Sequence, residues 1–296
     1  MKRGPVQAAK LLSKTLAIDS APKRASSLLA DLGLEAGWFP SDGQAREAAE
    51  RWERDFLSVL RRDMTSLGEL ERPCRFAFNS SSEYMIQGAA YEEPRDSVAL
   101  KQAKGKRRRF SEYVSALRGL DPRDFEAVCV GILAAFGVVD PVLTQYSADE
   151  GIDFYGHLKL KGVVFVDDLL PSVSEQMGIW LVGQAKHYQR SHISTFEVRD
   201  LVGAVSLAHA RAFGGSTSKY RDLQIRPCDA VFYLIFSTGQ MSRATWALVT
   251  KSGVIAMDGD MVATFLADRG IGVEGGRFST RKLRTWIARY REMPAV

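Results

Sequence analysis

Two short polar segments, Asp149-Glu-Gly-Ile-Asp153 and Gly183-Gln-Ala-Lys-His-Tyr188, bracket the part of the sequence that decides the fold. The second segment continues an apolar run, Gly178-Ile-Trp-Leu-Val-Gly183, which is short and rich in β-branched and aromatic residues. Runs of this length and composition are typical of buried strands. The sequence therefore predicts a central strand that ends in polar side chains, with the first segment at the edge of a neighbouring strand.

The polar residues at the end of this strand define a candidate site. Side chains alternate between the two faces of a strand, so Gln184 and Lys186 are expected on one face and Ala185 on the other. A lysine that is removed from water at the end of an apolar strand is costly unless an opposite charge satisfies it. Asp153 is the best candidate for that acidic partner.

Several motifs, in this order, resemble a known family. They are Phe125-Glu126 in a predicted helix, Asp149-x-Gly-Ile-Asp153, Gln184-x-Lys186, and two downstream segments, Phe236-Ser-Thr-Gly-Gln-Met-Ser-Arg-Ala244 and Ile255-Ala-Met-Asp-Gly259. Over residues 120–268 the sequence is similar to the catalytic domain of Mrr-type (type IV) restriction endonucleases. That domain belongs to the PD-(D/E)XK nuclease superfamily, in the branch where glutamine replaces the usual acid before x-Lys. The stretch 159–178 is longer than the connection that the family usually has there.

The resemblance implies hydrolysis of DNA phosphodiester bonds, with Mg²⁺ or Mn²⁺ as the cofactor. It makes Asp153 the principal metal ligand, Gln184 a donor of its amide oxygen, and Glu126 a ligand that restores the negative charge that glutamine lacks. Lys186 would orient or deprotonate the attacking water and stabilise the transition state. This chemistry suits the residues, because Mg²⁺ takes oxygen ligands and keeps several waters, and phosphodiester cleavage needs a cation and an activated water.

Each of these residues also has a simpler interpretation. Glu126 lies in the first turn of a helix predicted to begin at Asp121-Pro122, where an acid favours the helix dipole. Many strands end in polar residues, as this one does at Gln184 and Lys186. An acid at the position of Asp149 more often caps a turn than lies near an active site. The catalytic roles therefore depend on the resemblance.

The composition is that of a globular protein and suits a polyanionic partner. Of the 296 residues, 46% are hydrophobic and 25% charged, and the formal net charge is +5. The three cysteines are widely spaced and the four histidines lack zinc-ligand spacing, which indicates a reduced, cytoplasmic setting without structural zinc. Lysines interrupt the N-terminal apolar stretch, and the longest apolar run, residues 127–139, is too short to span a bilayer. P-loop, H-E-x-x-H and G-x-S-x-G motifs are absent.

Four regions are predicted along the chain. Residues 1–95 form a mainly helical N-terminal region for recognition or partner contact, residues 96–119 a basic linker, residues 120–270 the Mrr-like nuclease domain, and residues 271–296 a C-terminal tail and helix. Within the first region we expect two short helices before residue 36, a longer helix from Ser41, and a small β element around residues 75–78. Residues 270–275 match G-x-G-x-x-G, but they do not follow a strand, so we interpret them as a turn before a helix over 280–291.

Strands and helices alternate across the nuclease domain, which predicts an α/β fold with a central mixed sheet flanked by helices. The predicted strands are 142–146, 152–155, 178–186, the fully buried 230–236, and 254–256. The predicted helices are 122–136 with Phe136 inward, 193–213 with Phe196 and Leu207 inward, and two that Ser242 and Asp258 cap.

The linker contains six basic residues in nine, from Lys101 to Arg109. Such a run is either a solvated charged segment or a strip that contacts phosphates, because cations that neutralise a nucleic-acid backbone release counterions. Its place before the nuclease domain slightly favours phosphate contact. The candidates for DNA contact are Lys104, Lys106, Arg107, Arg108 and Arg109, together with His187 and Tyr188, although a half-exposed strand end explains the last two more simply.

The leading hypothesis is a metal-dependent DNA endonuclease that restricts modified foreign DNA. One alternative is a repair or recombination nuclease of the same fold that acts on junctions or flaps, and another is a nuclease-like module that only binds nucleic acid. The set of Asp153, Gln184 and Lys186 argues against the binding module, which has no need for so costly a cluster. Double-strand cleavage would favour a homodimer, and no membrane partner is expected.

Overall fold

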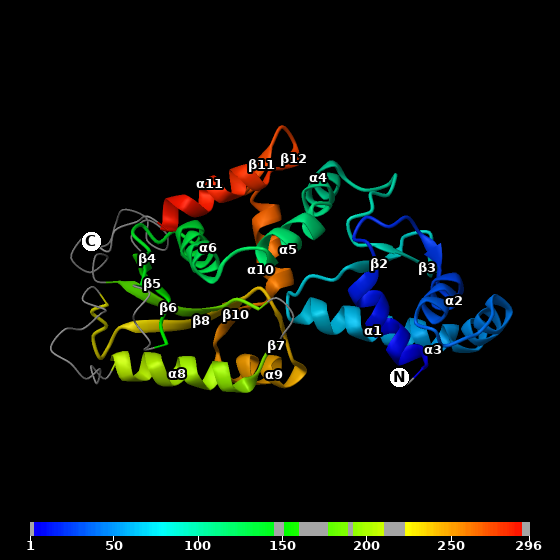
Figure 1. Ribbon diagram of the computed structural model, residues 1–296, viewed down its shortest axis with the longest axis horizontal. Helices are drawn as coiled ribbons and strands as arrows, with labels where there is room; N and C mark the ends of the chain where they lie inside the picture. Colours follow the sequence, from blue (N-terminus) through cyan, green and yellow to red (C-terminus); the bar gives the residue numbers. More distant parts are fainter. Residues whose placement is uncertain (1–2, 145–150, 160–176, 189–191, 210–222, 292–296) are drawn as a thin grey trace. The chain divides into compact units, whose positions relative to one another are not determined.

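The chain folds into two compact units, Met1–Ser111 and Glu112–Val296 (Figure 1). The computed structural model describes residues 3–144, 151–159, 177–188, 192–209 and 223–291. Asp149, most of the long stretch 159–178, and the predicted end of the helix at Phe213 lie outside those residues. No helix of the described part has both the length and the apolar character needed to cross a membrane.

The N-terminal unit consists mainly of helices with a small antiparallel sheet. The two short helices form as predicted, and the long helix begins directly after Ser41, whose hydroxyl accepts a hydrogen bond from the Gln44 N–H. The predicted β element is the first strand of a hairpin whose second strand also pairs with a short third strand. The elements are α1 (Pro5–Thr15), β1 (Lys23–Arg24), α2 (Ala25–Glu35), α3 (Asp42–Glu69), β2 (Phe76–Asn79) and β3 (Ser82–Gly88).

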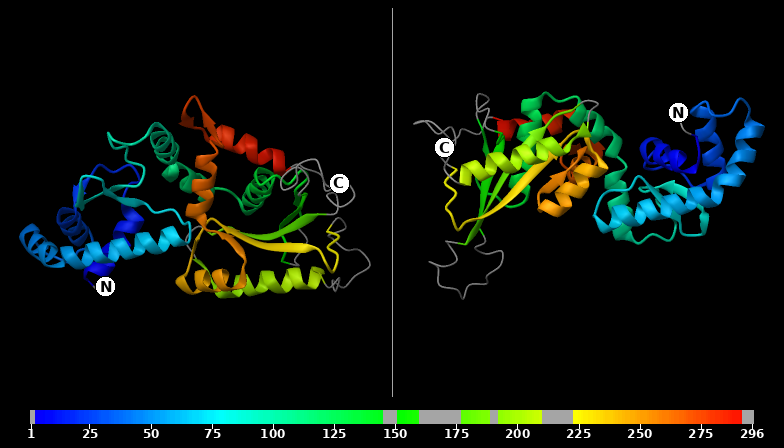
Figure 2. Two further views of the ribbon diagram at one scale, coloured as in Figure 1. Left: turned by 180° about the vertical axis from the view of Figure 1, so that it is seen from behind. Right: turned by 90° about the horizontal axis from the view of Figure 1, so that it is seen from below.

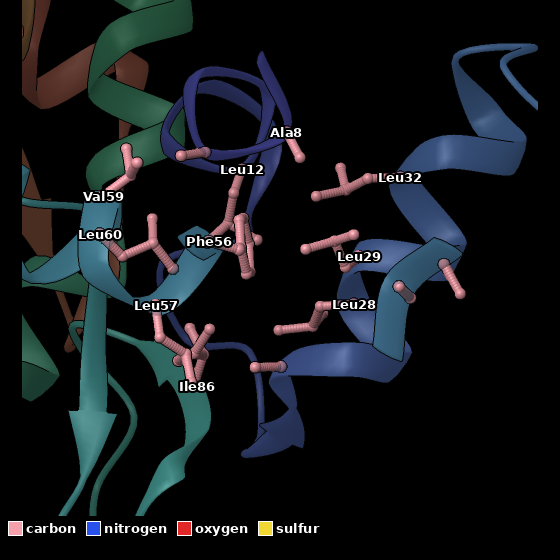
Figure 3. Packing of buried hydrophobic residues seen from close by; sticks show 14 of the residues in the cluster. Ala8, Leu12, Leu28, Leu29, Leu32, Phe56, Leu57, Val59, Leu60 and Ile86 are labelled. Carbon is pink, nitrogen blue, oxygen red and sulfur yellow. The ribbon is translucent and has the colours of Figure 1, made fainter. Parts of the chain in front are cut away.

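The apolar faces of these elements close one core. Leu12 of α1, Leu29 of α2 and Phe56 and Leu60 of α3 point toward one another, and Ile86 of β3 lies against them (Figure 3). Each of these side chains is at most 1% exposed. Apolar residues that recur at helical spacing form one stripe, and burial of that stripe is what holds an amphipathic helix in place.

The predicted basic linker is helical in the structure. Helix α4 (Val98–Arg107) begins after Ser97, whose hydroxyl accepts a hydrogen bond from the Leu100 N–H at 3.2 Å. Helix α5 (Phe110–Arg118) follows after two residues. The division between the two units falls near the start of α5.

The C-terminal unit is built on a five-stranded mixed sheet in the order β10-β8-β6-β5-β4. β6 and β8 run parallel, in register from Ile179 opposite Ala230 to Lys186 opposite Ser237, and β5 is antiparallel to β6. The strands are β4 (Val142–Leu143), β5 (Phe154–Lys159), β6 (Gly178–Lys186), β8 (Ala230–Ser237) and β10 (Ile255–Met257). A separate short parallel pair joins β7 (His192–Ile193) to β9 (Gln240–Met241).

Helices cover both faces of this sheet (Figures 1 and 2). Helix α6 (Pro122–Ala135) lies on one face, and α8 (Thr195–His209) and α9 (Arg243–Ser252) lie on the other. Side chains alternate accordingly: Tyr155 and Val182 pack with Leu201 of α8. Phe154 stacks on Phe236 at 5.5 Å between ring centroids. The predicted fold class is confirmed, with a mainly helical region before a mixed sheet that helices flank.

The two predicted caps are also confirmed. Ser242 accepts a hydrogen bond from the Thr245 N–H at 3.1 Å, and Asp258 accepts one from the Met261 N–H at 3.0 Å. They begin α9 and α10 (Gly259–Asp268) respectively.

Four side chains that periodicity placed inward are exposed. Phe136 is 37% exposed, Phe196 72% and Leu207 51%, and Phe232 is 45% exposed, so the strand 230–236 is buried only from Leu234 onward. These positions lie near the ends of their elements. Periodicity identifies the apolar face of an element, but it cannot show how far along that face the neighbouring element extends.

The last described helix packs against α6. The glycine-rich stretch 270–275 contains the predicted turn, but it also includes strand β11 (Val273–Glu274), which pairs with β12 (Arg277–Phe278). Helix α11 (Thr280–Arg291) follows, and its Trp286 and Tyr290 rings lie against Gly131 of α6. A Cβ atom on Gly131 would come within 2.4 Å of the Trp286 ring. At this helix contact, position 131 has room for the hydrogen of glycine but not for a side-chain carbon.

We predict that Gly131→Ala destabilises the protein by about 1–3 kcal/mol, because the added methyl group overpacks the contact between α6 and α11. Alanine is otherwise the better helix former by about 1 kcal/mol. The matched control is Gly203→Ala in α8, where nothing lies within 4 Å of the added Cβ, and there stability should rise. Urea unfolding compares the two variants with the wild type. Equal shifts for both would contradict the proposed packing.

Candidate active site

The end of strand β6 is held rigidly. The carbonyl oxygen of Lys186 accepts hydrogen bonds from the Ser237 hydroxyl at 2.9 Å and from the Thr238 N–H at 3.2 Å. Ser237 and Thr238 are buried at the end of β8. The backbone that carries Gln184 and Lys186 is therefore fixed by the neighbouring parallel strand.

Asp153 is held between β4 and β6 by its backbone and by its side chain. Its N–H donates to the Gly183 carbonyl at 3.0 Å, and its own carbonyl accepts from the Thr144 N–H at 3.0 Å. Its carboxylate Oδ2 accepts a hydrogen bond from the Ala185 N–H at 2.8 Å. Ala185 is the residue between Gln184 and Lys186, so Asp153 is tied directly to the predicted motif.

The charge of Asp153 lies in a partly desolvated setting. Burial raises the pKa of Asp153 above its ordinary value, while the hydrogen bond from Ala185 and the positive charges of Lys186 and Arg123 lower it in part. Lys186 is thus within electrostatic reach of Asp153, which is the acidic neighbour that the sequence led us to expect. A net raised pKa means that the ionised carboxylate is still short of compensating positive charge.

Helix α6 brings the second carboxylate. Asp121 caps the helix by accepting a hydrogen bond from the Asp124 N–H at 2.9 Å, and Pro122 takes the first helical position, both as predicted. Glu126 lies just beyond this first turn and pairs with Arg123 at 2.7 Å. Burial raises the pKa of Glu126, Arg123 lowers it, and the negative charge of Asp153 raises it further. Two acidic side chains from distant parts of the sequence therefore share one site.

Gln184 contributes a buried amide. Its side chain is 4% exposed, and its Oε1 atom has no hydrogen-bond partner among the described residues. Its Nε2 atom and Oδ2 of Asp200 in α8 both flank Gly151, at 3.8 and 4.0 Å from the position that a Cβ there would take. An unpartnered buried carbonyl oxygen is costly in a folded protein and points to a missing donor or cation.

Cys129 of α6 is electrostatically coupled to the two carboxylates. Its thiol is fully buried, and burial raises its pKa well above the ordinary value. The negative charges of Asp153 and Glu126 add to this effect. The thiol is therefore protonated and unreactive, and the two carboxylates exert a negative potential at its position.

Sequence reasoning missed Arg123 and Asp200. Arg123 lies in the first turn of α6 and pairs with Glu126 three residues on, a spacing that puts two helical side chains next to each other. That spacing was visible in the sequence. The approach of Asp200 to Gly151 was not, because it depends on how α8 packs across the sheet.

His187 and Tyr188 both have partners within the protein. The His187 Nε2 atom lies 3.2 Å from the Leu117 carbonyl oxygen, and the ring packs 6.0 Å from that of Phe125. The Tyr188 hydroxyl donates to Glu197 at 3.0 Å, and burial together with that carboxylate raises the pKa of Tyr188 to about 12. These contacts account for the two residues as parts of the sheet edge.

The basic stretch at the end of α4 and just after it contains both ion-paired and exposed side chains. Lys104 pairs with Asp96 at 2.8 Å, and the two side chains are only 13% and 9% exposed, so this pair fastens the helix to its own unit. Arg108 pairs with Glu92 at 3.4 Å and Arg109 donates to the Gly105 carbonyl at 3.5 Å. The exposed side chains are those of Lys106, Arg107 and Arg108.

The side chains at the site fit a divalent cation. Asp153 and Glu126 are carboxylates whose pKa values are raised by burial, and Gln184 offers an orphaned carbonyl oxygen. Mg²⁺ and Mn²⁺ prefer such oxygen donors, and Mg²⁺ completes its shell with water. The described residues contain no cluster of three or more histidine, cysteine or acidic side chains that would hold a metal. The fit therefore rests on two carboxylates and one amide.

Residues 117–218 match the family model Mrr_cat, described as a restriction endonuclease. The predicted resemblance is confirmed over that segment, which contains Glu126, Asp153, Gln184 and Lys186. The likeness of residues 236–259 to the same domain lies beyond the match and stays a prediction. A comparison with curated protein sequences found no match.

Restriction endonucleases are also among the similar solved structures. MspJI restriction endonuclease in complex with a 27-mer oligonucleotide is 17% identical, with a TM-score of 0.41, over 71% of this chain and 41% of that one. The DNA modification-dependent restriction endonuclease AspBHI is 17% identical, with a TM-score of 0.40, over 72% and 46%. FokI bound to DNA is 9% identical, with a TM-score of 0.34, over 89% and 45%. The chain spans less than half the length of each.

We predict that Asp153→Asn stabilises the metal-free protein at pH 7. Burial raises the pKa of Asp153 in the folded state, so stability is lost as the pH rises through that raised pKa. Asparagine removes this cost and keeps an oxygen to accept the hydrogen bond from Ala185. Near pH 4 the wild type and the variant should converge.

Urea unfolding in EDTA at the two pH values measures this difference. The control is Asp229→Asn, because the hydrogen bonds that Asp229 accepts from Arg226 lower its pKa. There the sign reverses, and the variant should be less stable at pH 7. An Asp153→Asn protein that is less stable than the wild type at pH 7 would show that Asp153 is already compensated.

Proposed function

We propose that this protein is a metal-dependent DNA endonuclease that hydrolyses phosphodiester bonds and restricts modified DNA. The proposal is supported by the electrostatic coupling of Asp153 with both Glu126 and Lys186, and by the buried, unpartnered Oε1 of Gln184 on the strand that carries Lys186. All four residues lie in the segment that matches a restriction endonuclease family. The restriction of modified DNA rests on the resemblance to type IV enzymes alone.

Asp153, Gln184 and Glu126 are the residues that would hold Mg²⁺ or Mn²⁺. When bound, the cation supplies charge that polarises the scissile phosphate and lowers the pKa of a water. Asp153 is positioned for this role by its bond from the Ala185 N–H, which leaves its second oxygen unconstrained by that contact. The unpartnered Oε1 of Gln184 would gain the partner that it lacks.

Lys186 and Arg123 supply the positive charge of the chain itself. Lys186 lies at the end of a strand fixed by β8, so its ammonium can orient the attacking water and stabilise charge that develops on the phosphate. Arg123 neutralises Glu126 and lowers the pKa of Asp153. It thereby keeps both carboxylates closer to the ionised state that metal binding requires.

The N-terminal unit and its helix α4 would supply further DNA contact. We assign phosphate contacts in this unit to the exposed Lys106, Arg107 and Arg108, with Arg109 beside them. Lys104 would act through its ion pair with Asp96, which holds the helix in place. His187 and Tyr188 would support the sheet edge next to the DNA through the partners described above. Cleavage of both strands would take two chains, and the enzyme would act in the cytoplasm.

The proposal is tested by nicking of supercoiled plasmid in Mg²⁺. Plasmids with and without cytosine or adenine methylation, and a branched duplex, are compared as substrates. Lys186→Ala should lower the rate by about 100-fold or more, since an interaction made in the transition state is lost, and Asp153→Ala should abolish cleavage. Both variants should keep the unfolding profile of a folded protein. The control is Lys251→Ala, an exposed lysine of α9.

Cleavage confined to methylated plasmid would establish restriction of modified DNA. Preference for the branched duplex would instead make the protein a repair or recombination nuclease. Salt-sensitive binding of DNA without cleavage of any substrate, or full activity of both site variants, would overturn the proposed active site.

A further inference from the structure

Helix α11 presents a strongly basic outer face. Its 12 residues include five that are basic and none that is acidic. All five are exposed, namely Arg281, Lys282, Arg284, Arg289 and Arg291. The opposite face is apolar, with Leu283 and Ile287 buried and the rings of Trp286 and Tyr290 set against α6. One face of the helix therefore packs against the protein, and the other is exposed and carries basic and polar side chains.

This helix is fixed to the helix that carries the candidate active site. The Arg291 Nη1 atom lies 2.5 Å from Asp124 Oδ1 and 3.6 Å from Asp121 Oδ2, at the start of α6. Arg123 and Glu126 lie in the same part of α6. The end of α11 is thus attached next to the turn that bears Glu126, and Figure 1 shows α11 alongside α6 on its outer side.

The positive charge of α11 is only partly neutralised. Arg281 and Lys282 share one acid, Glu274, at 3.2 and 3.5 Å, in exposed pairs of the kind that stabilise little. Arg284 and Arg289 make no ion pair or hydrogen bond with any described residue. The side chains between the arginines, Thr285 and Ala288, are short and exposed. A broad anionic surface can therefore approach the helix closely.

We propose that the outer face of α11 binds the phosphate backbone of the DNA duplex that is cut. This inference rests on the proposed function and adds a contact surface on the unit that holds the active site. A 12-residue helix is ~18 Å long, and a duplex of that length carries about ten phosphates. The outer face offers no large apolar side chain, so neither a partner helix nor a membrane interface would gain apolar burial there.

The test compares two double variants that each remove two exposed positive charges. Arg284→Ala with Arg289→Ala alters α11, and Arg243→Ala with Lys251→Ala alters α9 on the other face of the sheet. Both are made in a Lys186→Ala background, so that a short DNA duplex stays intact. Binding is followed by fluorescence anisotropy across a range of salt concentrations. Thermal unfolding checks that both variants keep their fold.

The α11 variant should bind at least about tenfold more weakly, with a slope of log affinity against log salt that is smaller by about 1.8, because each lost phosphate contact removes about 0.9. The α9 variant should bind like its parent. Equal slopes for the two variants would overturn the assignment of this surface. So would binding to vesicles of anionic lipid in place of the duplex.

Plasmid cleavage by the chain with Lys186 intact separates this inference from the proposed function. If the wild type cleaves plasmid and the substitutions of Arg284 and Arg289 do not change duplex binding, the α11 surface is contradicted and the nuclease function is supported. If binding depends on α11 but no plasmid is cleaved, the α11 surface is supported and the nuclease function is contradicted. Absence of salt-sensitive duplex binding would overturn both.

Discussion

Two acidic side chains that are partly removed from water, Asp153 and Glu126, form the constraint around which the C-terminal unit of this protein is arranged. The negative charge of Asp153 raises the pKa of Glu126, and both charges raise the pKa of the Cys129 thiol. The chain offsets this repulsion with Arg123, Lys186 and the Ala185 N–H, yet both pKa values remain raised. Such a residual imbalance costs stability and is typical of sites that bind a cation or perform proton chemistry.

The sheet topology brings these groups together. Parallel pairing of β6 with β8 fixes the strand that bears Gln184 and Lys186, while antiparallel pairing of β5 with β6 sets Asp153 next to Gly183. Helix α6 then adds Glu126 from one face. Helix α11 packs against α6 at Gly131, so the position of α6 depends on residues of α11 that are distant from it in the sequence.

Much of this arrangement could be predicted from local sequence. The apolar run before Gln184 predicted the central strand, and Asp121 with Pro122 predicted the start of α6. Those signals are local, since alternation, caps and proline act within a few residues. The family likeness added Glu126, which no local rule distinguishes from an ordinary acid near the start of a helix. The fold class followed from the order of strands and helices.

The rest depends on contacts between distant segments, which a single sequence does not reveal. Phe196 and Phe232 continue apolar patterns but are exposed. In the sequence Lys104 is one of six basic residues that cannot be told apart. In the structure it forms a largely buried ion pair with Asp96. The orphaned Oε1 of Gln184 is likewise a property of packing.

The most direct test of the site is calorimetric titration of Mg²⁺ into Lys186→Ala protein with duplex DNA, with and without Asp153→Asn. We expect saturable binding that Asp153→Asn removes, whereas equal binding by both proteins would contradict a role of Asp153 in holding the metal.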